Sequence, residues 1–272
     1  MTIKYYETST IEHIVEELYS FAFAKKDLPF ETPILPLCAT HISYFFGSEH
    51  NCYLNNKKSI LQGLMVSGQF TESYQIKVDG ESQVFGILLS PTSLYKLTKL
   101  DIYKIRNKHI PLIEFSESLF NTLNPVFEKY GNDMVKLNVE IKKVLASLEV
   151  KADKNASQID NVINYIGSKD GMLNTYELLD HVSFSQKTLE TQFKKIVGIT
   201  PGKYIRLHRF IKLMRKYERN KIDLKDLIYM YNYYDHSHFT KDFKHFMKQT
   251  PKEYFKSDYP FLTQYLKKLS LR

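Results

Sequence analysis

Phe193-Lys194-Lys195-Ile196-Val197-Gly198-Ile199-Thr200-Pro201-Gly202-Lys203-Tyr204 returns at an offset of 50 residues as Phe243-Lys244-His245-Phe246-Met247-Lys248-Gln249-Thr250-Pro251-Lys252-Glu253-Tyr254. Phe, Lys, Thr, Pro and Tyr recur in register. Upstream the offset becomes 49, since Leu178-Leu179 corresponds to Leu227-Ile228 and Phe184 to Tyr233. A turn whose length differs by one residue between the two copies explains this change of offset from 50 to 49. The sequence therefore predicts two copies of one supersecondary unit.

Each copy reads as two helices joined by a turn. The first helix is predicted over Thr175–His181 in one copy and over Asp223–Tyr231 in the other, with Asn174 and Asp223 as N-caps. The second helix is predicted to begin near Ser185 and near Asp235. This order of elements is typical of a helix-turn-helix unit.

The second helix of each copy has one apolar face. The same intervals, i, i+4, i+7 and i+8, separate Leu189, Phe193, Ile196 and Val197 in the first copy and Phe239, Phe243, Phe246 and Met247 in the second. We expect these residues to lie in the core. The opposite face then carries the polar side chains, which are Gln186, Lys187, Glu190, Thr191 and Lys194 in one copy and His236, Ser237, Thr240, Lys241 and Lys244 in the other. A helix that reads bases in the major groove needs this division, although a solvated helix face shows it too.

A longer helix is predicted between the copies, with Thr200 as N-cap and Pro201 as its first residue, running to about Arg219. At 1.5 Å per residue its length is about 27 Å. A rod of that length can hold two recognition helices about one DNA turn apart, near 34 Å. Its basic residues are candidate phosphate contacts, with solvated charge as the alternative: Arg206, Arg209, Arg215 and Lys216.

Residues 155–258 resemble the AraC/XylS-type DNA-binding domain. The stretches that carry the resemblance are Glu177–Ser185, Leu189-x3-Phe193-Lys194-Lys195, Gly198-Ile199-Thr200-Pro201-x2-Tyr204, Tyr233-x3-Ser237-His238-Phe239-x3-Phe243-Lys244 and Thr250-Pro251-x2-Tyr254. The resemblance implies a seven-helix domain with tandem helix-turn-helix units that binds promoter DNA, usually as an activator working with RNA polymerase. The residues at its base-reading positions are Lys187, Glu190, Thr191, His236, Ser237 and Lys241.

The full set of site residues predicted here is larger. Base-reading contacts are expected from Gln186, Lys187, Glu190, Thr191, His236, Ser237, Thr240 and Lys241. Phosphate contacts are expected from Ser185, Lys194, Lys195, Arg206, Arg209 and Lys244. The chain departs from the family by having Leu179 and Ile228 where Ala is preferred. It also has Ser183 and Asn232 where Gly is preferred in the turns. Asn tolerates a left-handed backbone better than most residues, so Ser183 is the more costly change.

Charge is divided unevenly along the chain. Residues 1–150 carry 15 Lys and Arg against 17 Asp and Glu, whereas residues 151–272 carry 23 against 13. The excess positive charge therefore lies in the C-terminal part, as phosphate neutralisation requires. No apolar run is long enough to cross a bilayer, and the first residues lack the pattern of a secretion signal. With only two cysteines, a cytoplasmic protein without a disulfide framework and without a membrane partner is expected.

The fold class predicted is α+β, with a β-rich domain followed by an all-α domain. The expected boundaries are 1–150 for a sensor or dimerisation domain, 151–157 for a linker, 158–258 for the DNA-binding domain and 259–272 for a C-terminal tail. Short aromatic and β-branched segments place strands at roughly 30–90, flanked by helices. Residues 114–150 are predicted as two helical segments with a break at Gly131-Asn132.

The β-rich region resembles, more loosely, the cupin-like sensor domains that precede AraC-type domains. The likeness is carried by Leu35-Pro36 and by Val84–Pro91 ahead of a helix at Ser93-Leu94-Tyr95. It implies sensing or dimerisation rather than catalysis. Together with the apolar periodicity of residues 114–150, it leads us to expect a homodimer through those helices and a small-molecule effector. Five aromatic residues are candidates for lining a pocket, although an aromatic core is the favoured interpretation: Tyr44, Phe46, Tyr53, Tyr74 and Phe85.

Two other functional classes remain open at this stage. A metal-dependent cupin enzyme would use His41, Glu49, His50 and Cys52, with Cys38 nearby, but the His-x-His pattern with a downstream Glu is missing. Buried free thiols are the expected state of Cys38 and Cys52. An interaction scaffold would use the tandem repeat to bind protein. No nucleophile elbow, phosphate-binding glycine loop or CxxC pair occurs, so neither an enzyme nor a cofactor is predicted.

Overall fold

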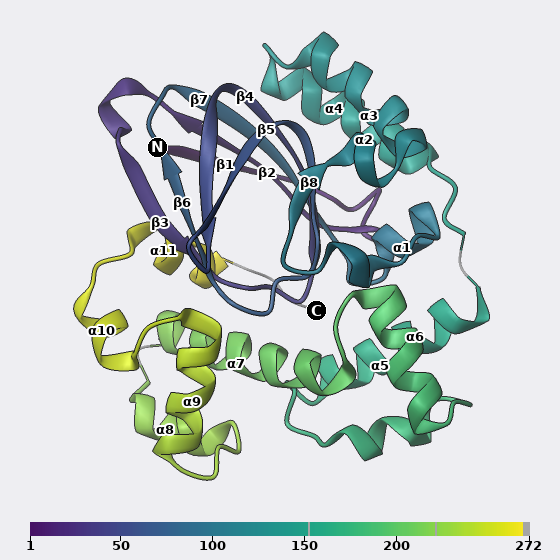
Figure 1. Cartoon of the computed structure of the whole chain (residues 1–272), viewed down its shortest axis with the longest axis vertical. Coiled ribbons are helices and arrows are strands. Elements are labelled where there is room, and N and C mark those ends of the chain that lie inside the picture. The colour runs from purple at the N-terminus through teal and green to yellow at the C-terminus, as the bar shows by residue number, and fades with distance from the viewer. Residues whose placement is uncertain (152, 221, 269–272) are drawn as a thin grey trace.

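The computed structural model describes residues 1–151, 153–220 and 222–268. Its N-terminal part is an antiparallel, strongly curved sheet, and its C-terminal part is helical (Figure 1). This arrangement confirms the α+β class predicted from the sequence. The strands of the sheet are β1 (Thr2–Tyr6), β2 (Val15–Phe23), β3 (Phe30–Ile34), β4 (Thr40–Leu54), β5 (Lys57–Ser67), β6 (Tyr74–Val78), β7 (Ser82–Leu89) and β8 (His109–Pro111).

The long strand β4 organises the sheet, whose main order is β1-β2-β7-β4-β5-β8. The first half of β4 pairs with β7, and its second half, from His50 on, pairs with β6, which also pairs with β3. The register against β5 shifts between Phe45 and His50. Such an irregularity bends a strand, and it lets β4 serve two neighbours on one edge.

The flank before residue 30 differs from the expectation of a helix. Residues 2–23 supply β1 and β2, which pair with each other, and β2 pairs with β7 from Val15 to Phe23. Pairing along the whole strand overrides the poor alternation of polar and apolar residues there. The local sequence pattern was therefore a poor guide to this segment.

The helices after β7 are α1 (Ser93–Thr98), the 3-10 helix η2 (Ile102–Ile105), α2 (Leu112–Phe115), α3 (Glu117–Tyr130) and α4 (Met134–Ser147). The last two confirm the predicted pair of helices and the break at Gly131-Asn132. Asp133 caps α4 by accepting hydrogen bonds from the Val135 and Lys136 amides. The buried face of α4 consists of Leu137, Ile141 and Leu145.

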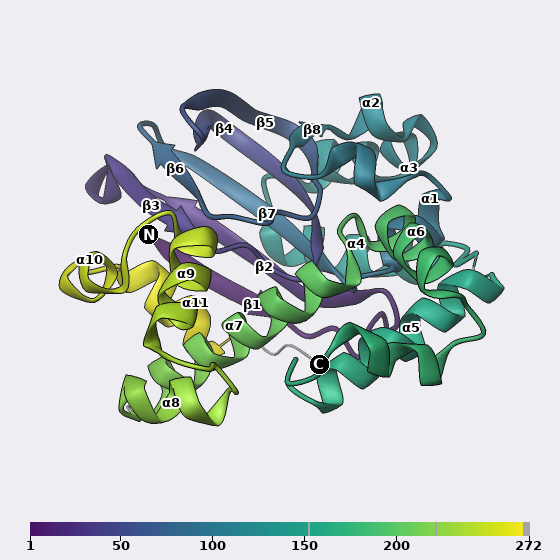
Figure 2. The ribbon, with the colours of Figure 1, turned by 60° about the horizontal axis from the view of Figure 1, so that its bottom comes forward.

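The helical part begins with α5 (Lys154–Ser168) and continues with the 3-10 helix η3 (Thr175–His181), α6 (Gln186–Val197), α7 (Pro201–Asn220), α8 (Leu224–Met230), α9 (His236–Met247), α10 (Pro251–Lys256) and α11 (Pro260–Lys268). From α5 to α10 these are seven helices within the described part of the chain, the number that the family resemblance implies. Figures 1 and 2 show α7 running beneath the sheet, with α6 near one end and α8 to α11 gathered towards the other.

Two predicted boundaries were wrong. Helix α5 starts at Lys154, inside the expected linker 151–157, because Asp153 caps it by accepting a hydrogen bond from the Ala156 amide. The expected tail 259–272 contains α11, whose Leu262 and Leu266 are buried and which packs on α7 and β3. Residue 152 of the linker and residues 269–272 of the tail lie outside the described residues.

Candidate nucleic-acid interface

The two helix-turn-helix units form where the repeat predicts them. The first consists of η3 and α6, and the second of α8 and α9. Asn174 and Asp223 cap the first helix of each unit, and Ser185 and Asp235 cap the second. The first helix of the first unit is a 3-10 helix rather than the expected α-helix.

The two turns differ in their backbone. Asn232 has a φ of 54°, so it takes the left-handed conformation that Asn tolerates. Ser183 has no positive φ, and its amide donates a hydrogen bond to Gln158 Oε1 at 2.6 Å. The cost expected for Ser183 was therefore wrong, because this turn does not need a left-handed residue at that position.

The apolar faces of α6 and α9 lie in the core, as predicted. Every residue of the two sets is at most 3% exposed: Leu189, Phe193, Ile196, Val197, Phe239, Phe243, Phe246 and Met247. On α7, Phe210 has its ring centroid 5.6 Å from that of Phe243 and so ties α9 to the connecting helix. The orientation of both helices is thus fixed by apolar packing.

The predicted base-reading side chains lie on the outward faces of α6 and α9. Glu190 and Thr240 are partly exposed, and the other six are exposed: Gln186, Lys187, Thr191, His236, Ser237 and Lys241. Thr191 donates a hydrogen bond to the Lys187 carbonyl at 2.9 Å, and Thr240 Oγ1 lies 3.2 Å from His236 Nδ1. Each face therefore offers donors and acceptors to a groove.

The residues predicted to hold phosphates are placed less uniformly. Lys194 and Lys244 lie in the last turns of α6 and α9. Ser185 is exposed, and its hydroxyl accepts a hydrogen bond from the Thr188 amide at 3.2 Å. Lys195 Nζ instead lies 5.7 Å from the Tyr95 ring centroid, so it points to the N-terminal domain.

Arg206 and Arg209 converge on Asp242, a carboxylate of α9 that is only 1% exposed. Arg206 makes an ion pair with it and stays half exposed, whereas Arg209 Nη2 lies 3.7 Å from Asp242 Oδ2 and its side chain is 12% exposed. The Arg209 guanidinium also lies 4.4 Å from the Tyr233 ring centroid. The expectation that Arg209 meets phosphates is not supported, because its guanidinium is held inside the domain by the Asp242 carboxylate and the Tyr233 ring.

Asp242 was not predicted as a functional or structural residue. It lies beside Phe243 and one turn from Phe239, so a carboxylate next to two core positions was the signal in the sequence. In the repeat it corresponds to Gln192, which accepts a hydrogen bond from Asn155 of α5 at 3.3 Å. The same position in the repeat thus joins α6 to α5 and α9 to α7.

The N-terminal domain contacts the C-terminal ends of α6 and α9 through residues 68–73, which we call the 68–73 loop. The Ser73 amide donates to the Phe246 carbonyl at 2.6 Å, and Glu72 makes an ion pair with Lys248. At the end of α6, Gly198 has a φ of 97°, and a Cβ there would lie 3.4 Å from Gln69 Cβ and 3.1 Å from Ile102 Cγ2. No feature of the local sequence pattern predicted this contact.

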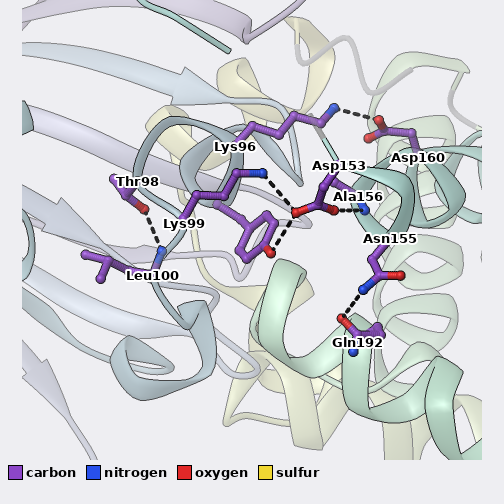
Figure 3. Close-up of polar contacts among 10 residues, drawn as sticks. Lys96, Thr98, Lys99, Leu100, Asp153, Asn155, Ala156, Asp160 and Gln192 are labelled. Carbon is purple, nitrogen blue, oxygen red and sulfur yellow. Dashed lines mark hydrogen bonds and ion pairs between the residues drawn. The ribbon is translucent and has the colours of Figure 1, made fainter. Parts of the chain in front are cut away.

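A second contact joins α1 to α5 (Figure 3). Lys96 Nζ lies 2.6 Å from Asp160 Oδ2, and Thr92 donates to the other oxygen of that carboxylate at 2.6 Å. Lys99 and Tyr95 donate to Asp153 Oδ2 at 2.9 and 3.0 Å. Burial raises the pKa of Asp153, but the hydrogen bonds from Ala156, Lys99 and Tyr95 outweigh it and lower the pKa below its usual value.

A cavity of about 120 Å³ lies between the curved sheet and α11. Of the five aromatic candidates only Tyr74 lines it. On β4 the side chains that line the cavity are His41, Ser43 and Phe45. Tyr44 and Phe46 lie on the opposite face of the strand and pack on Phe127 of α3. Because side chains alternate along a strand, the expected and observed linings differ by one residue in register.

The alternative metal ligands do not form a cluster. Within residues 1–151, 153–220 and 222–268, no group of three His, Cys, Asp or Glu side chains is placed to hold a metal ion. His50 Nε2 lies 2.8 Å from Ser82 Oγ, and Cys38 and Cys52 are buried free thiols, as predicted. Burial lowers the pKa of His41 and His50 to about 4.

Two matched helix-turn-helix units on one connecting helix, each with an apolar face in the core and a polar face outside, define a DNA-binding protein. None of the helices that the structure describes has the length and apolar character to span a membrane.

The comparisons with known proteins agree with this class. Residues 178–257 match a family described as "Helix-turn-helix domain", and residues 8–111 match a "Domain of unknown function (DUF6597)". The HTH-type transcriptional activator AarP of Providencia stuartii is 26% identical over 104 residues, which are 38% of this chain and 77% of AarP.

Among solved structures, ToxT from Vibrio cholerae is similar with a TM-score of 0.47 and 11% identity, covering 88% of this chain and 97% of ToxT. The AraC-like transcriptional activator CuxR is similar with a TM-score of 0.25 and 14% identity, covering 73% of this chain and 74% of CuxR. The helix-turn-helix match over residues 178–257 and the similarity to AarP support the likeness of the C-terminal region to the AraC-type DNA-binding domain.

Proposed function

We propose that the protein activates transcription by binding promoter DNA with α6 and α9 in successive major grooves. The observation that supports this most is the matched construction of the two helices. Their buried residues recur at the same intervals, and their exposed polar faces lie on helices fastened to one rod, α7, of about 30 Å. Two recognition helices on a rigid rod suit two groove segments about one turn apart.

Within this proposal the exposed side chains have separate roles. Gln186, Lys187, Glu190 and Thr191 read bases in one segment, and His236, Ser237, Thr240 and Lys241 read bases in the other. Lysine donates to guanine O6 or N7, and glutamate accepts from cytosine N4. Phosphate contacts come from Ser185, Lys194, Lys244 and the half-exposed Arg206.

The N-terminal domain supplies two further parts of the proposal. A homodimer forms through α4, which leaves Val135 and Val139 66% and 42% exposed one turn apart on its outer face. A small-molecule effector occupies the cavity of the curved sheet and modulates promoter binding. RNA polymerase is the partner that an activator of this family needs at the promoter.

DNA binding of the purified full-length chain tests the proposal. Affinity for the best genomic fragment should fall steeply between low and moderate salt. Changing both Lys187 and Lys241 to Ala should cost about 1–3 kcal/mol for each lysine on that fragment. The matched control is Lys57→Ala with Lys58→Ala, two exposed lysines of the N-terminal domain. Equal affinity of both double variants would contradict the proposed interface.

A further inference from the structure

The cavity of the curved sheet has one polar corner. Ser67 Oγ lies 2.6 Å from His109 Nδ1, and His109 Nε2 is buried without a hydrogen-bond partner in the described part of the chain. His109 lines the cavity, and a buried ring nitrogen without a partner costs free energy, so a ligand group that reaches Nε2 is stabilised by pairing with it. If Ser67 donates to Nδ1, Nε2 carries the proton and donates; if Ser67 accepts, Nε2 accepts. A hydroxyl group satisfies either state because it both donates and accepts.

The rest of the lining is apolar or uncharged. No Lys, Arg, Asp or Glu of the described residues lines the cavity. Burial lowers the pKa of His41 and His50 to about 4 and that of His109 to about 3, so these rings are neutral at pH 7. An ionised ligand would lose its hydration without gaining a counter-charge, which is strongly unfavourable.

Size and shape restrict the ligand further. An engineered apolar cavity of 150 Å³ takes benzene, and the cavity here is about 120 Å³. Aromatic rings make up much of the wall, and Tyr74 has its ring centroid 4.8 Å from that of His109. The smaller volume limits the ligand to a single ring, which can pack against rings of the wall.

Helix α11 closes the open side of the cavity. Phe261, Leu262 and Tyr265 all line it, and Phe261 makes edge-on ring contacts with Phe21 and Phe30 at 5.5 and 6.0 Å. Helix α11 follows the second helix-turn-helix unit along the chain and lies beyond the matched family domain, which ends at residue 257. A segment of the DNA-binding half is thus part of the ligand site.

We propose that this cavity binds an uncharged single-ring aromatic molecule whose hydroxyl group meets His109 Nε2 beside Ser67, with α11 as the lid. The 68–73 loop begins next to Ser67 and ends next to Tyr74, and its Phe70 ring lies 4.6 Å from the His109 ring. A ligand at this corner consequently contacts the residues that flank the 68–73 loop, and this loop in turn contacts both recognition helices. The ligand class rests on the proposal above that the cavity holds an effector, and the effect of the ligand on DNA binding rests on the proposed DNA-binding function.

Four probes that share a toluene frame test the ligand class on the full-length protein by ligand-detected NMR titration. They are p-cresol, toluene, 4-methylbenzoate and 4-methylbenzylammonium. We expect p-cresol to bind at least tenfold more tightly than either ion and three- to tenfold more tightly than toluene. Tighter binding of an ion than of p-cresol, or no binding of p-cresol below its solubility limit, overturns the proposal.

Variants locate the ligand. His109→Phe should reduce p-cresol affinity to that of toluene. Ser67→Ala removes only the partner of Nδ1 and should weaken p-cresol binding less than His109→Phe does. Phe261→Ala should weaken p-cresol and toluene alike because it opens the lid. The controls Gln62→Ala on β5 and Gln264→Ala on α11 change exposed residues and should leave affinity unchanged. Unaltered p-cresol binding in all three test variants would place the ligand elsewhere. If the unliganded chain binds DNA and p-cresol fails, only this inference falls.

Discussion

At the scale of single residues, Asp242 shows how a site can depend on a side chain that contacts no ligand. Its carboxylate is buried on α9 and receives Arg206, Arg209 and the hydroxyl of Tyr233, the last at 3.3 Å. A buried carboxylate is tolerable only with such partners. Arg209 is consequently a structural tie between α7 and α9, and it was the spacing of basic residues on α7 that made it look like a phosphate contact.

Asp242→Ala should lower the free energy of unfolding by about 3 kcal/mol, because it leaves the mostly buried Arg209 without its ion-pair partner. Urea unfolding of the full-length chain measures this. The control is Asp180→Ala, an exposed carboxylate of the first unit, which should change the value by no more than about 0.5 kcal/mol. Equal effects of the two substitutions would mean that the Asp242 cluster contributes no stability.

At the scale of elements, the repeat predicted the helix-turn-helix units well because their signals are local. Each N-cap is directly adjacent to the helix that it caps, and the apolar intervals lie within the single helices α6 and α9. The N-caps are Asn174, Ser185, Asp223 and Asp235. The strands β1 and β2 were missed because β2 is stabilised by pairing with β7, far along the chain, and β1 is held by pairing with β2. Helix α11 was missed because its partners, α7 and β3, are also distant from it in sequence.

Helix α4 shows a pattern that the sequence could not resolve. Its apolar residues fall on two faces, an inner one with Leu137, Ile141 and Leu145 and an outer one with Val135 and Val139. The spacing of the apolar residues in the sequence predicted a helix but did not separate its two apolar faces. The helix packs against α3 and leaves its outer face exposed, and we propose that this outer face binds a second copy of the chain.

Val135→Asp should shift the protein from dimer to monomer, because a charge on the buried face of an interface is costly to desolvate. Analytical ultracentrifugation across micromolar concentrations detects the shift. Asn121→Asp adds the same charge at an exposed position of α3 and should leave the dimer intact. A wild-type chain that sediments as a monomer at high micromolar concentration would refute the dimer.

At the scale of the whole molecule, the two halves share contacts that no local pattern reports. The 68–73 loop contacts the C-terminal ends of α6 and α9, and α11 lines the cavity of the sheet. The sequence predicted a linker between the two halves at residues 151–157. In the structure, Asp153 of this segment accepts hydrogen bonds from Tyr95 and Lys99 of the N-terminal half. The candidate DNA face was predictable from helical periodicity, whereas the ligand cavity and the domain contacts depend on tertiary structure.

Stability should depend on pH through four buried histidines. Burial lowers the pKa of His41, His50 and His208 to about 4 and that of His109 to about 3. Below the unfolded value of 6.5, the unfolded chain takes up protons that the folded chain does not, so stability falls as pH falls towards 4. Each histidine contributes up to about 1.4 kcal/mol per pH unit. Urea unfolding between pH 6.5 and 5 checks this, and a free energy that is constant across that range would contradict the neutral, buried state of these rings.

Selection of binding sites from a randomised duplex pool tests the central claim most directly, since it asks whether α6 and α9 each read sequence. The wild-type chain should select two short motifs whose centres lie about 10–10.5 base pairs apart. Lys187→Ala should relax preference at one or two base pairs in one motif, and Lys241→Ala should do so only in the other. Selection of a single motif, or relaxation of the same motif by both variants, would contradict reading by two recognition helices.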